Sequence, residues 1–265
     1  MQTCSVVIPV YKVLPNEDEL ISYSRCLFVL REYDIVIVSH KELDLSFYIN
    51  YARQYGKEIS VYYFDKYYFK GISGYNLLMY TNAFYKRFIN SEYILIYQLD
   101  AYVFSDQLKF WCSGKYIYIG APILREDINQ KKIYYGCNGG FSLRKINEFL
   151  TIYETNWYRK YVNVHINQTR AKWLGYLKIP CFLVAAFIAK HNIRLVLPRS
   201  TKQEDQFWSD VFTLPPLKEA SNFSLEKEPS YWYKENQGIL PFGCHAWEKY
   251  EKTSFWMKHI EGIKE

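Results

Sequence analysis

The stretch Glu92-Tyr-Ile-Leu-Ile-Tyr-Gln-Leu99 runs directly into Asp100 and decides the fold class of this 265-residue chain. A continuous run of apolar and aromatic residues is typical of a strand that is buried on both faces, as in a parallel sheet. Similar runs precede it at residues 5–10, 34–39 and 58–64, and helical patterns lie between them at 16–31, 43–54 and 73–88. This alternation predicts right-handed βαβ units and an α/β fold, with a mostly parallel central sheet flanked by helices.

The second half of the chain is less regular. We expect a glycine-rich turn at 136–140, helices near 145–153, 167–174, 180–191 and 204–212, and a strand at 194–197. Ser73 is the expected N-cap of the helix that begins there. No proline-, serine- or glycine-rich linker and no internal repeat interrupts the sequence, so we expect a single domain over residues 1–265.

The composition favours a soluble, cytoplasmic protein. The net charge is +6, from 33 Lys and Arg against 27 Asp and Glu, which suits a phosphate-bearing ligand but lacks the clustered basic surface of a nucleic-acid binder. The six cysteines form no CxxC pair, so we expect buried free thiols in a reducing compartment. We expect no signal peptide, and the longest apolar run, residues 181–189, is about half the length of a membrane span. The aromatic residues offer walls for sugars or bases, although codon usage explains their number equally well.

Two motifs follow predicted strands, where the ligands of such sheets bind. Asp100 ends the motif Gln98-Leu99-Asp100, so its carboxylate is a candidate ligand for a metal or a phosphate-bound cation; the alternative is an aspartate that caps a turn. The glycines of Asn138-Gly139-Gly140 allow a sugar or diphosphate to approach the main chain closely, and the alternative is a simple hairpin turn.

Two further motifs lie toward the carboxyl terminus. Glu204 and Asp205 open a predicted helix, where their charges favour the helix dipole or where one of them acts as a general base toward an acceptor hydroxyl. Trp208, one turn later, could stack on a sugar. His245 ends the motif Pro241-Phe-Gly-Cys-His245, and its imidazole is either a surface group or a ligand suited to Mn²⁺.

The order of these motifs resembles that of glycosyltransferases of the GT-A fold. Residues 5–11 look like the opening strand of that fold, whose end holds the nucleotide base, and Gln98-Leu99-Asp100 sits where its Asp-X-Asp motif lies. Residues 138–141 resemble the donor-sugar loop, and Glu204-Asp205 resembles the acceptor-side acidic pair. His245 matches a late metal-binding histidine found in several branches of the fold.

The sequence also resembles a little-characterised family of bacterial glycosyltransferase-like proteins. The blocks Tyr118-Ile-Gly-Ala-Pro122, Asn-Gly-Gly-Phe-Ser-Leu-Arg144, Glu204-Asp205 and Pro-Phe-Gly-Cys-His245 recur there in the same order, whereas the first 80 residues match more generically. The chain departs from the GT-A pattern at Gln98, which stands where the first aspartate is usual. Asp100 would keep the metal ligand, and the Gln98 amide would take over the contact to ribose or base.

The resemblance implies a metal-dependent, inverting hexosyltransferase. Residues 1–100 would form the nucleotide-binding half, and residues 101–265 the donor-sugar and acceptor half. Asp100 and His245 would hold Mn²⁺ or Mg²⁺ against the diphosphate of a nucleotide-sugar, by default a UDP-hexose, while Asp205, or alternatively Glu204, would be the base. The implied donor contacts are Pro9, Val10, Tyr11, Lys70, Gln98, Asp100, Asn138, Gly139, Gly140 and Arg144, and the implied acceptor contact is Trp208.

The implied acceptor is a glycan, either a growing surface polysaccharide or a lipid-linked oligosaccharide. A lipid-linked acceptor would bring the protein to the inner face of the membrane, through the basic and aromatic stretch 157–173. Two other classes stay open. A glycoside hydrolase also needs paired carboxylates, but these flank the sugar and need neither nucleotide nor metal. A noncatalytic nucleotide-sugar or carbohydrate-binding protein is the other class, and the departure at Gln98 is its best support.

Overall fold

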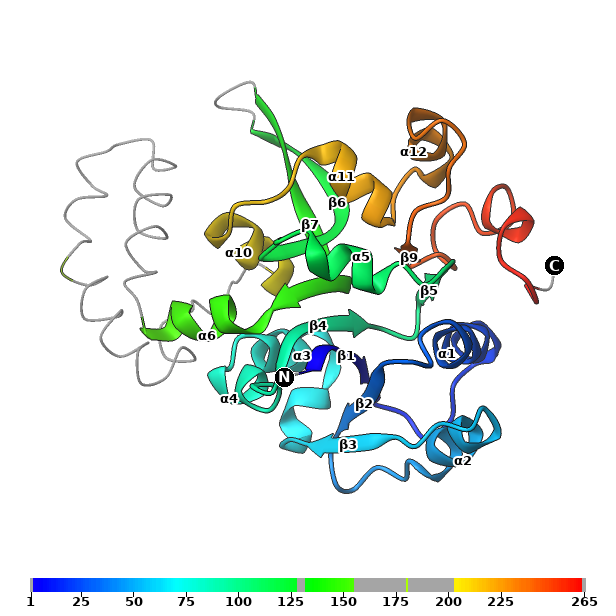
Figure 1. Cartoon of the computed structure of the whole chain (residues 1–265), viewed down its shortest axis with the longest axis vertical. Helices are drawn as coiled ribbons and strands as arrows, with labels where there is room; N and C mark the ends of the chain where they lie inside the picture. Colours follow the sequence, from blue (N-terminus) through cyan, green and yellow to red (C-terminus); the bar gives the residue numbers. More distant parts are fainter. Residues whose placement is uncertain (1, 128–131, 155–179, 181–202, 264–265) are drawn as a thin grey trace.

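The computed structural model describes residues 2–127, 132–154, 180 and 203–263, and its centre is a six-stranded sheet (Figure 1). The strand order is β3-β2-β1-β4-β7-β6. The strands are β1 (Gln2–Pro9), β2 (Asp34–Ser39), β3 (Ser60–Tyr63), β4 (Ser91–Tyr97), β6 (Tyr118–Asp127) and β7 (Lys132–Lys145). The four strands predicted in the first hundred residues are therefore present.

The pairing makes the sheet mostly parallel. β1 pairs in parallel with β2 and β4, and β2 pairs in parallel with β3. β7 is antiparallel to both of its neighbours, β4 and β6. The carboxyl ends of β1, β2 and β4 consequently lie at one edge of the sheet, and the predicted α/β class with a mostly parallel sheet is confirmed.

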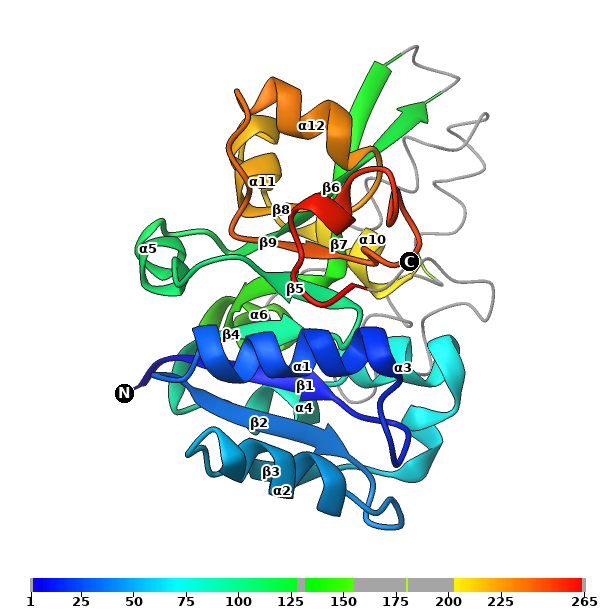
Figure 2. The ribbon, with the colours of Figure 1, turned by 90° about the vertical axis from the view of Figure 1, so that its right-hand side faces the viewer.

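Helices cover both faces of the sheet because β1, β2 and β4 are apolar on both sides. On one face, α1 (Glu17–Val29), α2 (Ser46–Gln54) and α5 (Leu108–Ser113) share a buried core with β1 and β4. Figure 2 shows α1 in front of β1, on this face of the sheet. On the other face, α3 (Gly71–Met79), α4 (Asn82–Lys86), α6 (Ile146–Glu154) and α10 (Glu204–Val211) share a second core.

The caps explain where the helices begin. Asn16 and Glu19 form a reciprocal capping box at the start of α1, as expected for a helix that begins after Asn16. The single helix predicted over 73–88 is wrong, because Thr81 accepts a hydrogen bond from the Phe84 amide and starts α4 separately. The predicted cap at Ser73 is also wrong, since α3 already begins at Gly71.

A smaller sheet packs beside the main one and carries the site. It has the order β5-β9-β8, made of β5 (Ala101–Val103), β9 (Gly243–His245) and β8 (Ser224–Leu225). β5 is antiparallel to β9 and brings Ala101 opposite His245. The remaining elements of the described chain are η1 (Lys66–Phe69), α11 (Leu217–Phe223), α12 (Pro229–Glu235) and η3 (Trp256–Lys258).

Several sequence predictions fall on residues 155–202. The helices predicted at 167–174 and 180–191, the strand at 194–197 and the membrane-facing stretch 157–173 lie outside the described residues, apart from residue 180. Among the residues that the structure describes, no helix is long and apolar enough to cross a membrane. The five cysteines in the described ranges are buried free thiols, as predicted.

Candidate functional site

Asp100 and His245 meet at the carboxyl edge of β4. The chain turns after β4, where the Ala101 amide donates to the Gln98 carbonyl, and then enters β5. Because Ala101 of β5 lies opposite His245 of β9, this turn brings Asp100 to the imidazole. Nε2 of His245 lies 3.1 Å from Oδ1 of Asp100. Two residues that the sequence nominated as a pair are thus in direct contact.

Three more side chains complete what we call the Asp100 cluster: Gln98, Glu226 and Lys249. Oε1 of Gln98 lies 3.1 Å from Nε2 of His245. Oε2 of Glu226 lies 3.6 Å from the other imidazole nitrogen, Nδ1. Nζ of Lys249 lies 3.1 Å from Oδ2 of Asp100, so the two carboxylate oxygens of Asp100 face two different cationic partners.

The charged groups of the Asp100 cluster shift one another's pKa values. Burial alone would lower the pKa of His245, but the carboxylates of Asp100 and Glu226 raise it to about 10. Burial would likewise raise the pKa of Asp100, yet His245 and Lys249 hold it well below its usual range. At neutral pH the cluster therefore contains an imidazolium and an ionised aspartate.

Sequence reasoning missed Glu226 and Lys249. Glu226 directly follows β8, and the parallel pairing of β8 with β9 carries it to His245. Lys249 reaches Asp100 because the chain reverses after β9 at Ala246, whose φ is 49°. Strands of two and three residues and a single left-handed residue leave no periodic signal in the sequence.

Gly139 and Gly140 are strand residues, so the turn predicted at 136–140 is wrong. β7 continues through both glycines to Lys145. A Cβ on Gly140 would lie 2.0 Å from Nε2 of His245 and 2.8 Å from Oε1 of Gln98. A Cβ on Gly139 would lie 2.2 Å from Oε1 of Glu204. The glycines are needed because β7 passes between two groups of polar side chains with no room for a methyl group.

The second of these groups is a buried ion pair between Arg144 and Glu204. The guanidinium donates to both carboxylate oxygens, at 2.8 and 3.1 Å, and also to the carbonyl of Gly139. Both side chains are buried, with exposures of 0% and 3%. Arg144 therefore lies behind Gly139, where its charge is satisfied by protein groups, and the predicted diphosphate contact has no accessible donor.

Asp205 and Trp208 lie on α10, next to this ion pair. Asp205 is buried in the first turn of the helix, and its carboxylate contributes to raising the pKa of Tyr118, which burial raises most. Trp208 is fully buried, with ring centroids 4.8 Å from Phe149 and 5.6 Å from Phe212. Its indole has no face left for a sugar, so the acceptor contact predicted for Trp208 does not fit its packing.

The remaining predicted residues lie at the end of β1, within β7 and just after η1. Pro9 ends β1, Val10 is buried, and Tyr11 is 60% exposed. Burial raises the pKa of the Tyr11 hydroxyl, and the carboxylates of Glu19 and Asp100 add to that rise. Asn138 uses its side-chain oxygen to accept a hydrogen bond from the Gly140 amide. Lys70 is exposed between η1 and α3.

α3 contributes two residues that were not predicted. Burial raises the pKa of Tyr75, and the carboxylates of Glu204 and Asp100 both add to the rise. Tyr75 is thus close enough to both Asp100 and Glu204 to feel their charges. The side-chain oxygen of Asn76 accepts a hydrogen bond from the Glu204 amide and fixes the start of α10.

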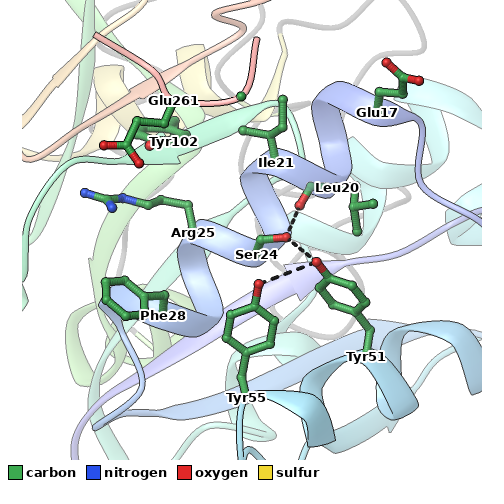
Figure 3. A pocket seen from close by; sticks show the side chains of 11 residues that line it. Glu17, Leu20, Ile21, Ser24, Arg25, Phe28, Tyr51, Tyr55, Tyr102 and Glu261 are labelled. Carbon is green, nitrogen blue, oxygen red and sulfur yellow. Dashed lines mark hydrogen bonds between the residues drawn. The ribbon is translucent and has the colours of Figure 1, made fainter. Parts of the chain in front are cut away.

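A separate groove of about 620 Å³ runs along α1 (Figure 3). Figure 3 shows Ser24 between the Leu20 carbonyl and the Tyr51 hydroxyl, with Tyr55 beyond. Arg25 also lines the groove, but its guanidinium is bound to the carbonyls of Val103 and Phe104. None of the residues predicted for the site lines this groove.

The donor set of Asp100 and His245 fits a divalent cation in part. Two ligands in neighbouring octahedral positions, each about 2.1 Å from an ion, lie about 3 Å apart, which is close to the observed separation of 3.1 Å. Glu226 faces the second imidazole nitrogen, as a carboxylate commonly does behind a metal-binding histidine. Among the described residues no group of three or more His, Cys, Asp or Glu side chains is arranged to hold a metal. Such an ion would therefore depend on ligands from a bound substrate.

The fold and the cluster define an α/β protein with a polar site at the carboxyl edge of its parallel strands. The chain belongs to the family described as protein of unknown function (DUF5672), whose model matches residues 58–245. That match begins before β3 and ends at His245. A similar solved structure is the crystal structure of A197 from STIV, with 10% identity and a TM-score of 0.28, covering 57% of this chain and 68% of that one. No curated protein matches the sequence.

Proposed function

We propose that this protein is a metal-dependent glycosyltransferase of the GT-A fold that moves a sugar from a nucleotide-sugar to an acceptor hydroxyl. The observation that carries the proposal is the contact of Asp100 with His245 at the carboxyl edge of the parallel strands. The strand order, with antiparallel β7 inserted beside β4, supports it. The donor is a UDP-hexose, and the acceptor is a glycan or a lipid-linked oligosaccharide in surface polysaccharide synthesis.

Asp100 and His245, once the imidazolium has released its proton, would hold Mn²⁺ or Mg²⁺, which would stabilise the negative charge of a departing diphosphate. His245 favours Mn²⁺ over Mg²⁺. Oε1 of Gln98 lies 3.1 Å from Nε2 of His245, and the amide NH₂ group of Gln98 would donate to ribose or base. Gly140 keeps the main chain close to these groups.

We assign the general base to Asp205 rather than to Glu204. Arg144 engages both oxygens of Glu204, so that carboxylate is already neutralised. Asp205 would take the proton of the acceptor hydroxyl as the acceptor oxygen bonds to the anomeric carbon. The bond from that carbon to the diphosphate oxygen breaks at the same time, and the oxygen keeps the electron pair. Attack opposite the leaving group inverts the anomeric carbon.

A second candidate is a noncatalytic nucleotide-sugar-binding protein. The observation in its favour is that Asp100 already faces two cationic groups, His245 and Lys249. Such a protein would bind a nucleoside diphosphate without a metal and without turnover.

The test is a thermal-shift and turnover panel on the full chain. UDP and UDP-hexoses are added with Mn²⁺ or with EDTA, and release of UDP is followed with and without glycan acceptors. We expect Mn²⁺ and UDP together to raise the Tm, and Asp100→Asn and His245→Gln to remove that rise. Asp106→Asn is the control, because this aspartate binds the Tyr33 hydroxyl at the surface. No response to any nucleotide with Mn²⁺ would reject the proposal, whereas binding without turnover would favour the second candidate.

A further inference from the structure

Lys249 has a fixed backbone, which belongs to a tight turn, and an exposed side chain. The turn begins at Ala246, in the left-handed region, and the Lys249 amide donates to the Ala246 carbonyl at 3.0 Å. The neighbouring Trp247 is fully buried and anchors the turn. The side chain of Lys249, by contrast, is 59% exposed. Its ammonium can therefore move while its backbone stays in place.

That ammonium occupies one side of Asp100. Nζ lies 3.1 Å from Oδ2 of Asp100 and 3.3 Å from Oε1 of Glu248. The other oxygen of Asp100 faces His245, so the carboxylate is neutralised by protein groups alone. A divalent ion bound to Asp100 would repel an ammonium at this distance. The lysine and the ion therefore compete for the same carboxylate.

We propose that Lys249 is a built-in counter-ion of Asp100, which gives way to the divalent cation and then donates to the diphosphate of the donor. This inference rests on the proposed function, because it requires a metal and a nucleoside diphosphate at Asp100. The displaced ammonium carries three donors on a flexible stem, and phosphate oxygens beside the ion would offer it a new anionic partner. Metal and nucleotide then bind with positive coupling, since each makes the displacement of Lys249 more favourable for the other.

Removing Lys249 should therefore change the affinities for the two ligands, each measured alone, in opposite directions. Without Lys249, Mn²⁺ has only the proton of His245 to displace from Asp100, so Mn²⁺ alone binds more tightly. UDP alone, in EDTA, loses a cationic partner and binds more weakly. A residue that only supports the fold would change both affinities in the same direction.

The experiment is isothermal titration calorimetry of the full chain with Mn²⁺ alone, with UDP in EDTA, and with UDP at saturating Mn²⁺. For Lys249→Met we expect Mn²⁺ affinity to rise, and UDP affinity in EDTA to fall, each by about threefold to fivefold, as fits a half-exposed ion pair. Lys249→Arg keeps the charge and should bind UDP nearly as the wild type does. Lys252→Met is the matched control, because Lys252 pairs with Asp18 and not with Asp100.

Three results would overturn the inference. Lys249→Met could leave both affinities within twofold of the wild type, or it could lower both. The control Lys252→Met could also reproduce the opposite shifts. If the wild type binds UDP with Mn²⁺ but Lys249→Met lacks the opposite shifts, the proposed function stands and only the role of Lys249 is rejected. A wild-type chain that binds neither ligand would reject both. Thermal unfolding of each variant, measured alongside, shows that the comparison concerns folded protein.

Discussion

Replacing Gly140 by alanine should damage the Asp100 cluster without greatly weakening the fold. The added Cβ would lie 2.0 Å from Nε2 of His245, whereas unbonded heavy atoms of this kind stay about 3.5 Å apart. The imidazole must therefore move by about 1.5 Å. It cannot move freely, because Asp100, Gln98 and Glu226 surround it. The contact from Nε2 to Asp100, now 3.1 Å, would be lost.

The loss can be converted into an affinity. The contact reflects the geometry in which both side chains would face one ion, so its loss should weaken binding of Mn²⁺ with UDP by about 10- to 100-fold, as is typical when the orientation of metal ligands is disturbed. The assay is calorimetry of UDP at saturating Mn²⁺, with urea unfolding as the measure of stability. Alanine itself suits a strand better than glycine, which offsets part of any loss in the free energy of unfolding.

Gly139→Ala is the matched control, one residue away on the same strand. Its Cβ would lie 2.2 Å from Oε1 of Glu204 and would separate the buried Arg144–Glu204 pair. Breaking a buried pair costs about 3–5 kcal/mol of the free energy of unfolding, so this variant should lose stability and keep ligand affinity once folded. Two results would refute this expectation. Gly140→Ala could bind UDP and Mn²⁺ as the wild type does, or both variants could lose stability and ligand affinity in the same proportion.

Three further predictions follow from the same geometry. Glu204→Gln leaves the buried Arg144 without a counter-charge and should lower the free energy of unfolding by about 3 kcal/mol in urea; an unchanged midpoint would contradict the structural role of the pair. Asp205→Asn should reduce sugar transfer by at least about 100-fold while UDP affinity stays near that of the wild type; full turnover would remove Asp205 as the base. In EDTA, the protonated His245 should stabilise the fold fully below about pH 6.5, and this contribution should disappear as the pH rises through about 10, the raised pKa of the folded state. Urea unfolding at pH 7 and pH 10.5 measures this loss, and His245→Gln should be free of it.

The strands of the first hundred residues were predictable because each is a run of mostly apolar residues. β1, β2 and β4 are buried on both faces, so their sequences are continuously apolar, and the helices between them show their own period. The failure at 73–88 has a local cause: Thr81 offers a cap that competes with continuation of the helix.

The site was predictable only where a residue type stands out beside a recognisable element. Asp100 follows a long strand, and His245 lies in a motif that resembles a family. Glu226 and Lys249 reach the same place through the pairing of β8 with β9 and through one left-handed residue at Ala246. These are long-range or single-residue features, so neither composition nor periodicity could reveal them. Trp208 shows the opposite error: an aromatic residue beside two carboxylates suggests a sugar contact, but its neighbours Phe149 and Phe212 enclose it in the core.

The Arg144–Glu204 pair and the Asp100 cluster, which lie on either side of Gly139 and Gly140, differ in their exposure to solvent and therefore in their roles. Arg144 and Glu204 are closed to solvent and satisfy each other through two hydrogen bonds, so exchanging either partner would leave a buried charge unpaired. Asp100 is 23% exposed, and its partner Lys249 is more than half exposed, so here a partner can be exchanged at low cost. A carboxylate at the ligand edge of the sheet, neutralised by a movable cation, is suited to exchanging that cation for another. Because β7 holds both groups apart with two glycines, the closed pair can fix the strand while the open cluster changes its partners.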